Sequence, residues 1–80
     1  MTVNERRDRI KAIIAEFANL EISEIKDDST MHDDIGLDSL DIVEVVMSVE
    51  KEFNIVVDDA DIERAATVSQ FIDTMVKDME

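Results

Sequence analysis

The sequence predicts a small all-α protein, a four-helix bundle with three long helices and one short helix. Three observations favour this class. Apolar residues recur at helical spacing in separate stretches, and the 80 residues include no proline and only one glycine. The one strand-like segment, residues 53–57, has no second strand to pair with. A chain of this length is expected to form one domain, residues 1–80, that buries about 60% of its unfolded surface.

The first helix is expected to begin after Thr2, because Thr2 and Glu5 have the spacing of a capping box. It should end near Asn19, a residue that tolerates the left-handed conformation found at helix ends. Residues 20–38 then form a long loop, which isolated apolar side chains anchor to the core. Loops of this length in small domains are usually functional or disordered, and the anchors favour a functional loop. The predicted anchors are Leu20, Ile22, Ile25, Met31 and Ile35.

The second helix, from Ser39 to about Phe53, has two apolar faces. Both could be buried if this helix were central, but a helix in a small bundle needs only one buried face. We therefore expect the second face to be exposed and to bind an apolar groove ringed by Lys and Arg. The predicted core face is Ile42, Val45, Val46, Val49 and Phe53. The predicted partner face is Leu40, Val43 and Met47, flanked by Asp41, Glu44 and Glu50.

A short third helix is expected around residues 60–64, capped by Asp58 or Asp59. The last helix should follow Thr67, because Thr67 and Gln70 repeat the capping-box spacing. Its apolar stripe is predicted to be Val68, Phe71, Ile72, Met75 and Met79.

The net charge of −13 argues against binding to nucleic acid or to an anionic membrane. Four of the eight cations lie in the first eleven residues, so the remainder is still more acidic. This charge favours a cationic partner over a role in solubility alone, and it favours a monomer.

Without cysteine there is no disulfide, thiolate metal site or thiol nucleophile. No signal-peptide pattern or apolar run of membrane-spanning length is present, so we expect a cytoplasmic protein.

The stretch "GLDSLD" at residues 36–41 raises the question of what Ser39 does. A catalytic serine is disfavoured, because the pattern is not G-x-S-x-G and His32 is the only candidate base. An EF-hand is excluded, because aligning Gly36 with the glycine of its loop puts apolar residues at ligand positions. No catalytic or metal-binding residue is therefore predicted.

Two interpretations of Ser39 remain. In one it accepts a group that carries a phosphate, and in the other it is simply tolerated in the first turn of the helix. Asp38 is a good N-cap, which places Ser39 among the free N–H groups at the positive end of the helix dipole. Gly36 allows the preceding loop to turn sharply and leaves room for a modifying enzyme. These residues alone do not specify the modification.

The segment "DDIGLDSLDIVEVVMSVEKEFNI", residues 33–55, resembles the signature of discrete acyl carrier proteins. The first-helix pattern "IKAIIAEF", the loop "SEIKDDSTMHDDIG" and the closing "TVSQFIDTMV" are similar to the same family, so the resemblance covers most of the chain. It departs from the family at two points. The segment "VVDDAD" lacks the usual proline before the third helix, and Lys51 stands where an acid is common.

The resemblance implies a carrier that is not an enzyme. Ser39 would take a 4′-phosphopantetheine arm from coenzyme A through a phosphopantetheinyl transferase, with Gly36, Asp38 and Leu40 completing the motif. The arm would hold acyl groups as thioesters in type II fatty acid synthesis. Alternatives are a specialised pathway such as polyketide synthesis or, from another class, an acidic helical regulatory domain. The acids and apolar residues of the partner face would meet basic patches on transferases, ketoacyl synthases and reductases. The acyl chain would be sheltered between the helices, in a channel lined by Val49, Phe53, Ile72 and neighbouring apolar positions.

Overall fold

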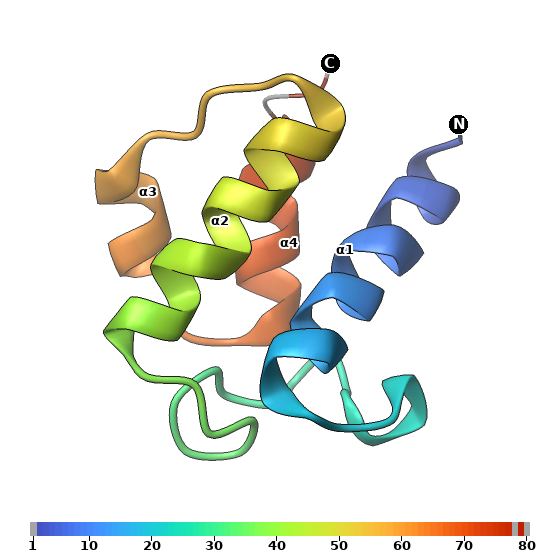
Figure 1. The fold of residues 1–80 in the computed structure, drawn as a ribbon, viewed down its shortest axis with the longest axis vertical. Helices are drawn as coiled ribbons and strands as arrows, with labels where there is room; N and C mark the ends of the chain where they lie inside the picture. The colour runs from blue at the N-terminus through green and yellow to red at the C-terminus, as the bar shows by residue number, and fades with distance from the viewer. Residues whose placement is uncertain (1, 78, 80) are drawn as a thin grey trace.

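The computed structural model describes residues 2–77 and 79 and confirms the predicted all-α class. Helices α1, α2 and α4 form the body, with α1 running antiparallel to the other two (Figure 1). The short α3 lies at one edge and packs against α4, and a long loop crosses the end of the bundle below α1 and α2. The elements are α1 (Val3–Ala18), a 3-10 turn (Ile22–Glu24), α2 (Ser39–Phe53), α3 (Asp59–Arg64) and α4 (Val68–Lys77).

The ends of α1 and α2 follow from their capping residues. The Thr2 hydroxyl accepts a hydrogen bond from the Glu5 N–H, and the Glu5 carboxylate accepts one from the Thr2 N–H. The bond to the Thr2 backbone holds the pKa of Glu5 below its usual value. Asn19 and Asn54 adopt the left-handed conformation, with φ of 58° and 56°, and end α1 and α2.

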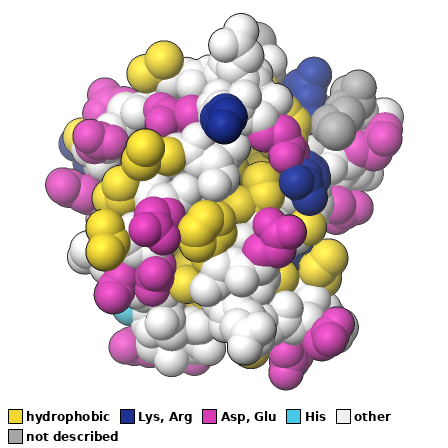
Figure 2. All heavy atoms as spheres, viewed as in Figure 1, with side chains coloured by type: hydrophobic (Ala, Val, Ile, Leu, Met, Phe, Trp, Pro, Cys, Tyr) yellow, Lys and Arg dark blue, Asp and Glu magenta, His cyan; other side chains and the backbone are white. Residues whose placement is uncertain are grey.

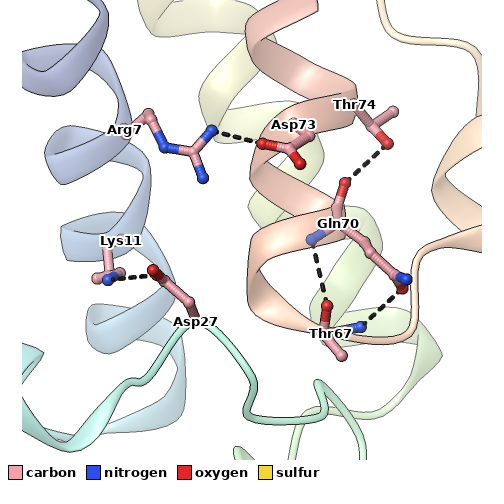
Figure 3. A network of polar contacts seen from close by, with 7 residues as sticks. All are labelled: Arg7, Lys11, Asp27, Thr67, Gln70, Asp73 and Thr74. Atoms are coloured by element: carbon pink, nitrogen blue, oxygen red, sulfur yellow. Dashed lines mark hydrogen bonds and ion pairs between the residues drawn. The ribbon is translucent and has the colours of Figure 1, made fainter.

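Short polar caps also start α3 and α4. The Asp58 carboxylate accepts a 2.9 Å bond from the Ala60 N–H and so begins α3 without a proline. Thr67 and Gln70 bond reciprocally at the start of α4 (Figure 3), as their spacing predicted. Of the predicted stripe, Val68, Phe71, Ile72 and Met75 are buried, and Met79 lies beyond the end of the helix and is partly buried.

The long loop is attached to the core by side chains and by backbone bonds. Ile25, Met31 and Ile35 are buried as predicted, and Leu20 is partly buried. Ile22 is about half exposed, so its prediction as an anchor is wrong, since its short 3-10 turn lies on the surface. Leu37 is also buried and is a further anchor that was not predicted. Backbone bonds from Met31 N–H to the Ala66 carbonyl and from Val68 N–H to the Ser29 carbonyl join the loop to the start of α4.

Three of the cations clustered near the N-terminus form ion pairs within the molecule. Arg7 pairs with Asp73 of α4 and Lys11 with Asp27 of the loop (Figure 3). Arg9 donates two bonds, of 2.6 and 2.7 Å, to the carboxylate of Glu52 on α2. These contacts lower the pKa of Asp27 and of Glu52, each through the hydrogen bond from its partner. The N-terminal cations therefore stabilise the bundle, while the surface of α2 and α3 stays predominantly acidic.

Candidate functional site

Ser39 is exposed in the first turn of α2, where the capping box fixes the backbone. The Asp38 carboxylate accepts a 2.8 Å bond from the Asp41 N–H, and the Asp41 carboxylate accepts a 3.3 Å bond from the Asp38 N–H. The serine hydroxyl therefore sits at a rigid helix start, at the positive end of the helix dipole. This position is favourable for a group carrying a phosphate.

The turn before Ser39 depends on Gly36. Its φ is +85°, a conformation that residues with a side chain rarely adopt, and a Cβ there would meet no atom within 4 Å. Glycine is thus needed for the backbone angle and not for close packing. After this turn the Leu37 N–H donates to the Met31 carbonyl at 3.0 Å, which closes the loop before the helix begins.

His32 contributes to the same turn. Its Nδ1–H donates to the Leu37 carbonyl at 2.8 Å, because a carbonyl can only accept. In a serine hydrolase triad that nitrogen would be oriented by a carboxylate. The observed bond instead gives His32 a role in shaping the loop, although the side chain is exposed as expected.

A partly open cavity of about 380 Å³ lies between α2 and α3, and Ser39 and His32 line it where α2 begins. Most of its other lining residues are apolar. Residues of α3 and the start of α4 were missed by sequence reasoning, because only the folded position of α3 brings them opposite α2. The remaining lining residues are Ile42, Val43, Val46, Met47, Glu50, Asp59, Ile62, Glu63, Ala65 and Phe71.

Val49, Phe53 and Ile72, the residues named for the predicted acyl channel, do not line this cavity, whereas the neighbouring apolar residues Val46 and Phe71 do. Val49 and Ile72 are fully buried in the core that α2 and α4 share with α1. Phe53 is the last residue of α2, at the end of the helix away from Ser39, and is only partly buried. The side chains of α2 that do line the cavity lie on the side of the helix that faces α3.

The second apolar face of α2 is exposed, which excludes the alternative that both faces are buried. Leu40, Val43 and Met47 are 67%, 51% and 60% exposed, whereas the core face holds the buried Val45, Val46 and Val49. Figure 2 shows hydrophobic side chains on this side of the molecule interspersed with acidic ones. Val43 and Met47 also line the cavity, so the exposed face and the cavity are continuous.

The three acids predicted to flank this face differ in their surroundings. Glu44 is exposed, and Asp41 is partly buried and holds the capping box. Glu50 is also partly buried, and its carboxylate accepts a 2.8 Å bond from the Val57 N–H in the segment that joins α2 to α3. Glu50 therefore has a structural contact that the sequence pattern did not reveal.

Residues 2–77 and 79 contain no group of three or more His, Cys, Asp or Glu side chains arranged to hold a metal ion. No helix in this part of the chain is long and apolar enough to cross a membrane.

Comparison with known proteins identifies the family. The family model of the phosphopantetheine attachment site matches residues 8–75. The acyl carrier protein of Chlorobium luteolum is 43% identical over 77 residues, which cover 96% of this chain and 99% of that protein. That of Thermotoga maritima is 39% identical over 69 residues, covering 86% and 85%. A solved structure of the acyl carrier protein from Enterococcus faecalis matches with a TM-score of 0.78 and 29% identity, covering 98% of this chain and 99% of that one.

These matches agree with the exposed serine at a helix start and the acidic, two-faced helix that follows it. The cofactor of the family is phosphopantetheine, and its members are carriers and not enzymes. The chain belongs to the acyl carrier protein family.

Proposed function

We propose that residues 1–80 act as one carrier domain that holds acyl groups as thioesters on a 4′-phosphopantetheine arm attached to Ser39. The observation that carries this proposal is the exposed Ser39 in the first turn of α2, beside an apolar cavity. The Ser39 oxygen would form the new bond to phosphorus as the pyrophosphate bond of coenzyme A breaks, with adenosine 3′,5′-bisphosphate leaving and the hydroxyl proton passing to a base of the transferase. Asp38, Gly36 and Leu40 complete the site by capping the helix, turning the loop and presenting an apolar side chain.

Each partner enzyme would dock on the exposed face of α2. Leu40, Val43 and Met47 supply apolar contact, and Glu44 supplies a negative charge at their border. Asp41 and Glu50 add charge to the field while also making contacts within the molecule. Phosphopantetheinyl transferases, acyl transferases, ketoacyl synthases and reductases with basic patches fit this surface.

The cavity between α2 and α3 would shelter the acyl chain. Its apolar lining and its continuity with the exposed face support a chain that enters from the arm and leaves toward a docked enzyme. We further propose that the protein is a cytoplasmic monomer of type II fatty acid synthesis, because self-association would bring together surfaces of like charge.

The pathway is tested by reconstitution. The holo-protein is incubated with acetyl and malonyl coenzyme A, reduced nicotinamide cofactor, a malonyl transferase and the purified enzymes of a type II fatty acid synthase. Intact mass should reveal acyl groups that grow by successive two-carbon steps. A protein that accepts malonyl but is never extended would contradict the fatty acid pathway and favour a specialised one. Met47→Glu should slow extension, whereas Val56→Glu, at an exposed valine outside α2, should not.

A further inference from the structure

Phe71 has a distinct position in the wall of the cavity. Among the described lining residues it is the only one from α4, because the others come from α2, from α3 or from segments outside the helices. It is 1% exposed and is one of the largest fully buried side chains. Its ring therefore closes the side of the cavity that faces the core.

The ring is also held firmly in place. The Phe71 N–H donates to the Thr67 carbonyl at 3.0 Å, and the reciprocal bonds of Thr67 and Gln70 fix the same turn. Ile72 and Met75, its neighbours on α4, are fully buried in a close-packed core. A chain that reaches the ring cannot push it aside without disturbing this core.

We propose that Phe71 is the residue that sets the maximum length of the acyl chain sheltered by this protein. The inference rests on the proposed attachment of the arm at Ser39. A cavity of about 150 Å³ holds one benzene molecule, which has about six carbon-sized groups. By the same ratio of volume to carbon, the cavity of about 380 Å³ holds about fifteen such groups. The thioester end of the arm and the open side take part of this space, which leaves room for a chain of about eight to ten carbons.

The charge of the lining selects the chemical class of the chain. Glu50, Asp59 and Glu63 line the cavity, and among the described lining residues there is no Lys or Arg. A chain that ends in a carboxylate would bring a fourth negative charge into the same space without a cation to pair with it. The sheltered chains are therefore neutral and aliphatic, while the carboxylate of a malonyl group stays in solvent.

The test compares melting temperatures along a series of saturated acyl groups, from acetyl to palmitoyl, each loaded onto the arm. In the wild type the melting temperature should rise with chain length until about eight to ten carbons and then stay constant, because further methylenes find no apolar space. In Phe71→Leu, which removes three carbons from the wall, the same plateau should begin about two to three carbons later. The NMR chemical shifts of the backbone amides in α2 and α3 should change with each longer chain up to the same chain length, and then stay constant.

Two control variants separate this role from a general effect on stability. Ile72→Val alters a fully buried neighbour on α4 that does not line the cavity, so it should lower all melting temperatures without moving the plateau. Phe71→Met leaves a side chain of about the same volume as Phe71→Leu does, so it should move the plateau by a similar amount, which would show that the shift follows the volume of the wall.

The outcomes are distinguishable. A plateau at the same chain length in folded, loaded Phe71→Leu would overturn the role of Phe71 and leave the carrier function intact. A wild-type melting temperature independent of chain length would overturn the cavity as a shelter. Failure of the arm to attach would overturn the proposed function together with this inference, and it would be seen before any chain is varied.

Discussion

The hydrogen bond from the Val57 N–H to Glu50 offers a sharp test of the structure. Glu50 lies on α2, and its carboxylate reaches the segment that leads to α3 at 2.8 Å. Val57 is buried, so its N–H has limited access to water once the acceptor is removed. Glu50→Ala should therefore loosen the segment that joins α2 to α3 and destabilise the whole protein.

The expected size follows from the kind of bond. A hydrogen bond to a charged group contributes about 1.5 to 3 kcal/mol, and the partial exposure of Glu50 places it at the lower end, about 1.5 kcal/mol. For a domain of this size each kcal/mol shifts the melting temperature by about 4 to 8 °C, so a fall of about 6 to 12 °C is expected. Removing one negative charge from an acidic protein relieves some repulsion, which makes the observed fall smaller.

Glu44→Ala is the matched control, because it removes the same side chain from an exposed position of the same helix. Subtracting its effect removes the contributions of charge and helix propensity. Glu50→Gln should stay close to the wild type, since the amide oxygen can still accept the bond from Val57. Calorimetry gives the melting temperatures, and hydrogen exchange of the Val57 amide should be about tenfold faster in Glu50→Ala. Equal melting temperatures for Glu50→Ala and Glu44→Ala would refute the reasoning.

Three further predictions concern other parts of the molecule. The pKa of Glu52 is held below its usual 4.5 by Arg9, so its contribution to stability is present above that pH and is lost as pH falls through the lowered value. The free energies of unfolding of the wild type and of Glu52→Gln, measured in urea from neutral to acidic pH, should converge below about pH 4.5. A difference between these free energies that stays constant with pH would contradict the ion pair. Gly36→Ala should cost about 1 to 2 kcal/mol by calorimetry, because φ is +85° although the space is open; no loss would mean that the turn adopts another conformation. Met47→Glu should weaken binding of a basic partner enzyme severalfold by titration calorimetry, and unchanged affinity would argue against the exposed face of α2 as the docking surface.

Much of the fold could be predicted because its signals are local. The caps at Thr2 and Thr67 depend on side chains three residues away and form the expected reciprocal bonds, and Asp38 caps α2 as predicted. The two faces of α2 follow from the helical period alone, and the exposure of Met47 agrees with that period. The left-handed Asn19 likewise needs only its own short side chain and the end of the helix before it.

The features that sequence reasoning missed depend on contacts between distant segments. The cavity is lined by residues of α2, α3 and α4, so its members depend on where α3 lies, which periodicity does not specify. Glu50 was predicted as a surface acid, and its bond to Val57 arises only when the α2–α3 segment folds back over the helix. Ile22 was expected to be buried because it is apolar, but its short turn leaves it on the surface.

The measurement that tests the central claim most directly is the intact mass of the protein after incubation with coenzyme A, magnesium and a broad-specificity phosphopantetheinyl transferase. Ser39→Ala is treated in parallel, and Ser48→Ala, which alters a partly buried serine in the middle of α2, is the control. We predict one phosphopantetheinyl increment on the wild type and on Ser48→Ala, and none on Ser39→Ala. No increment on folded wild type with several transferases, or an increment that persists in Ser39→Ala, would contradict it.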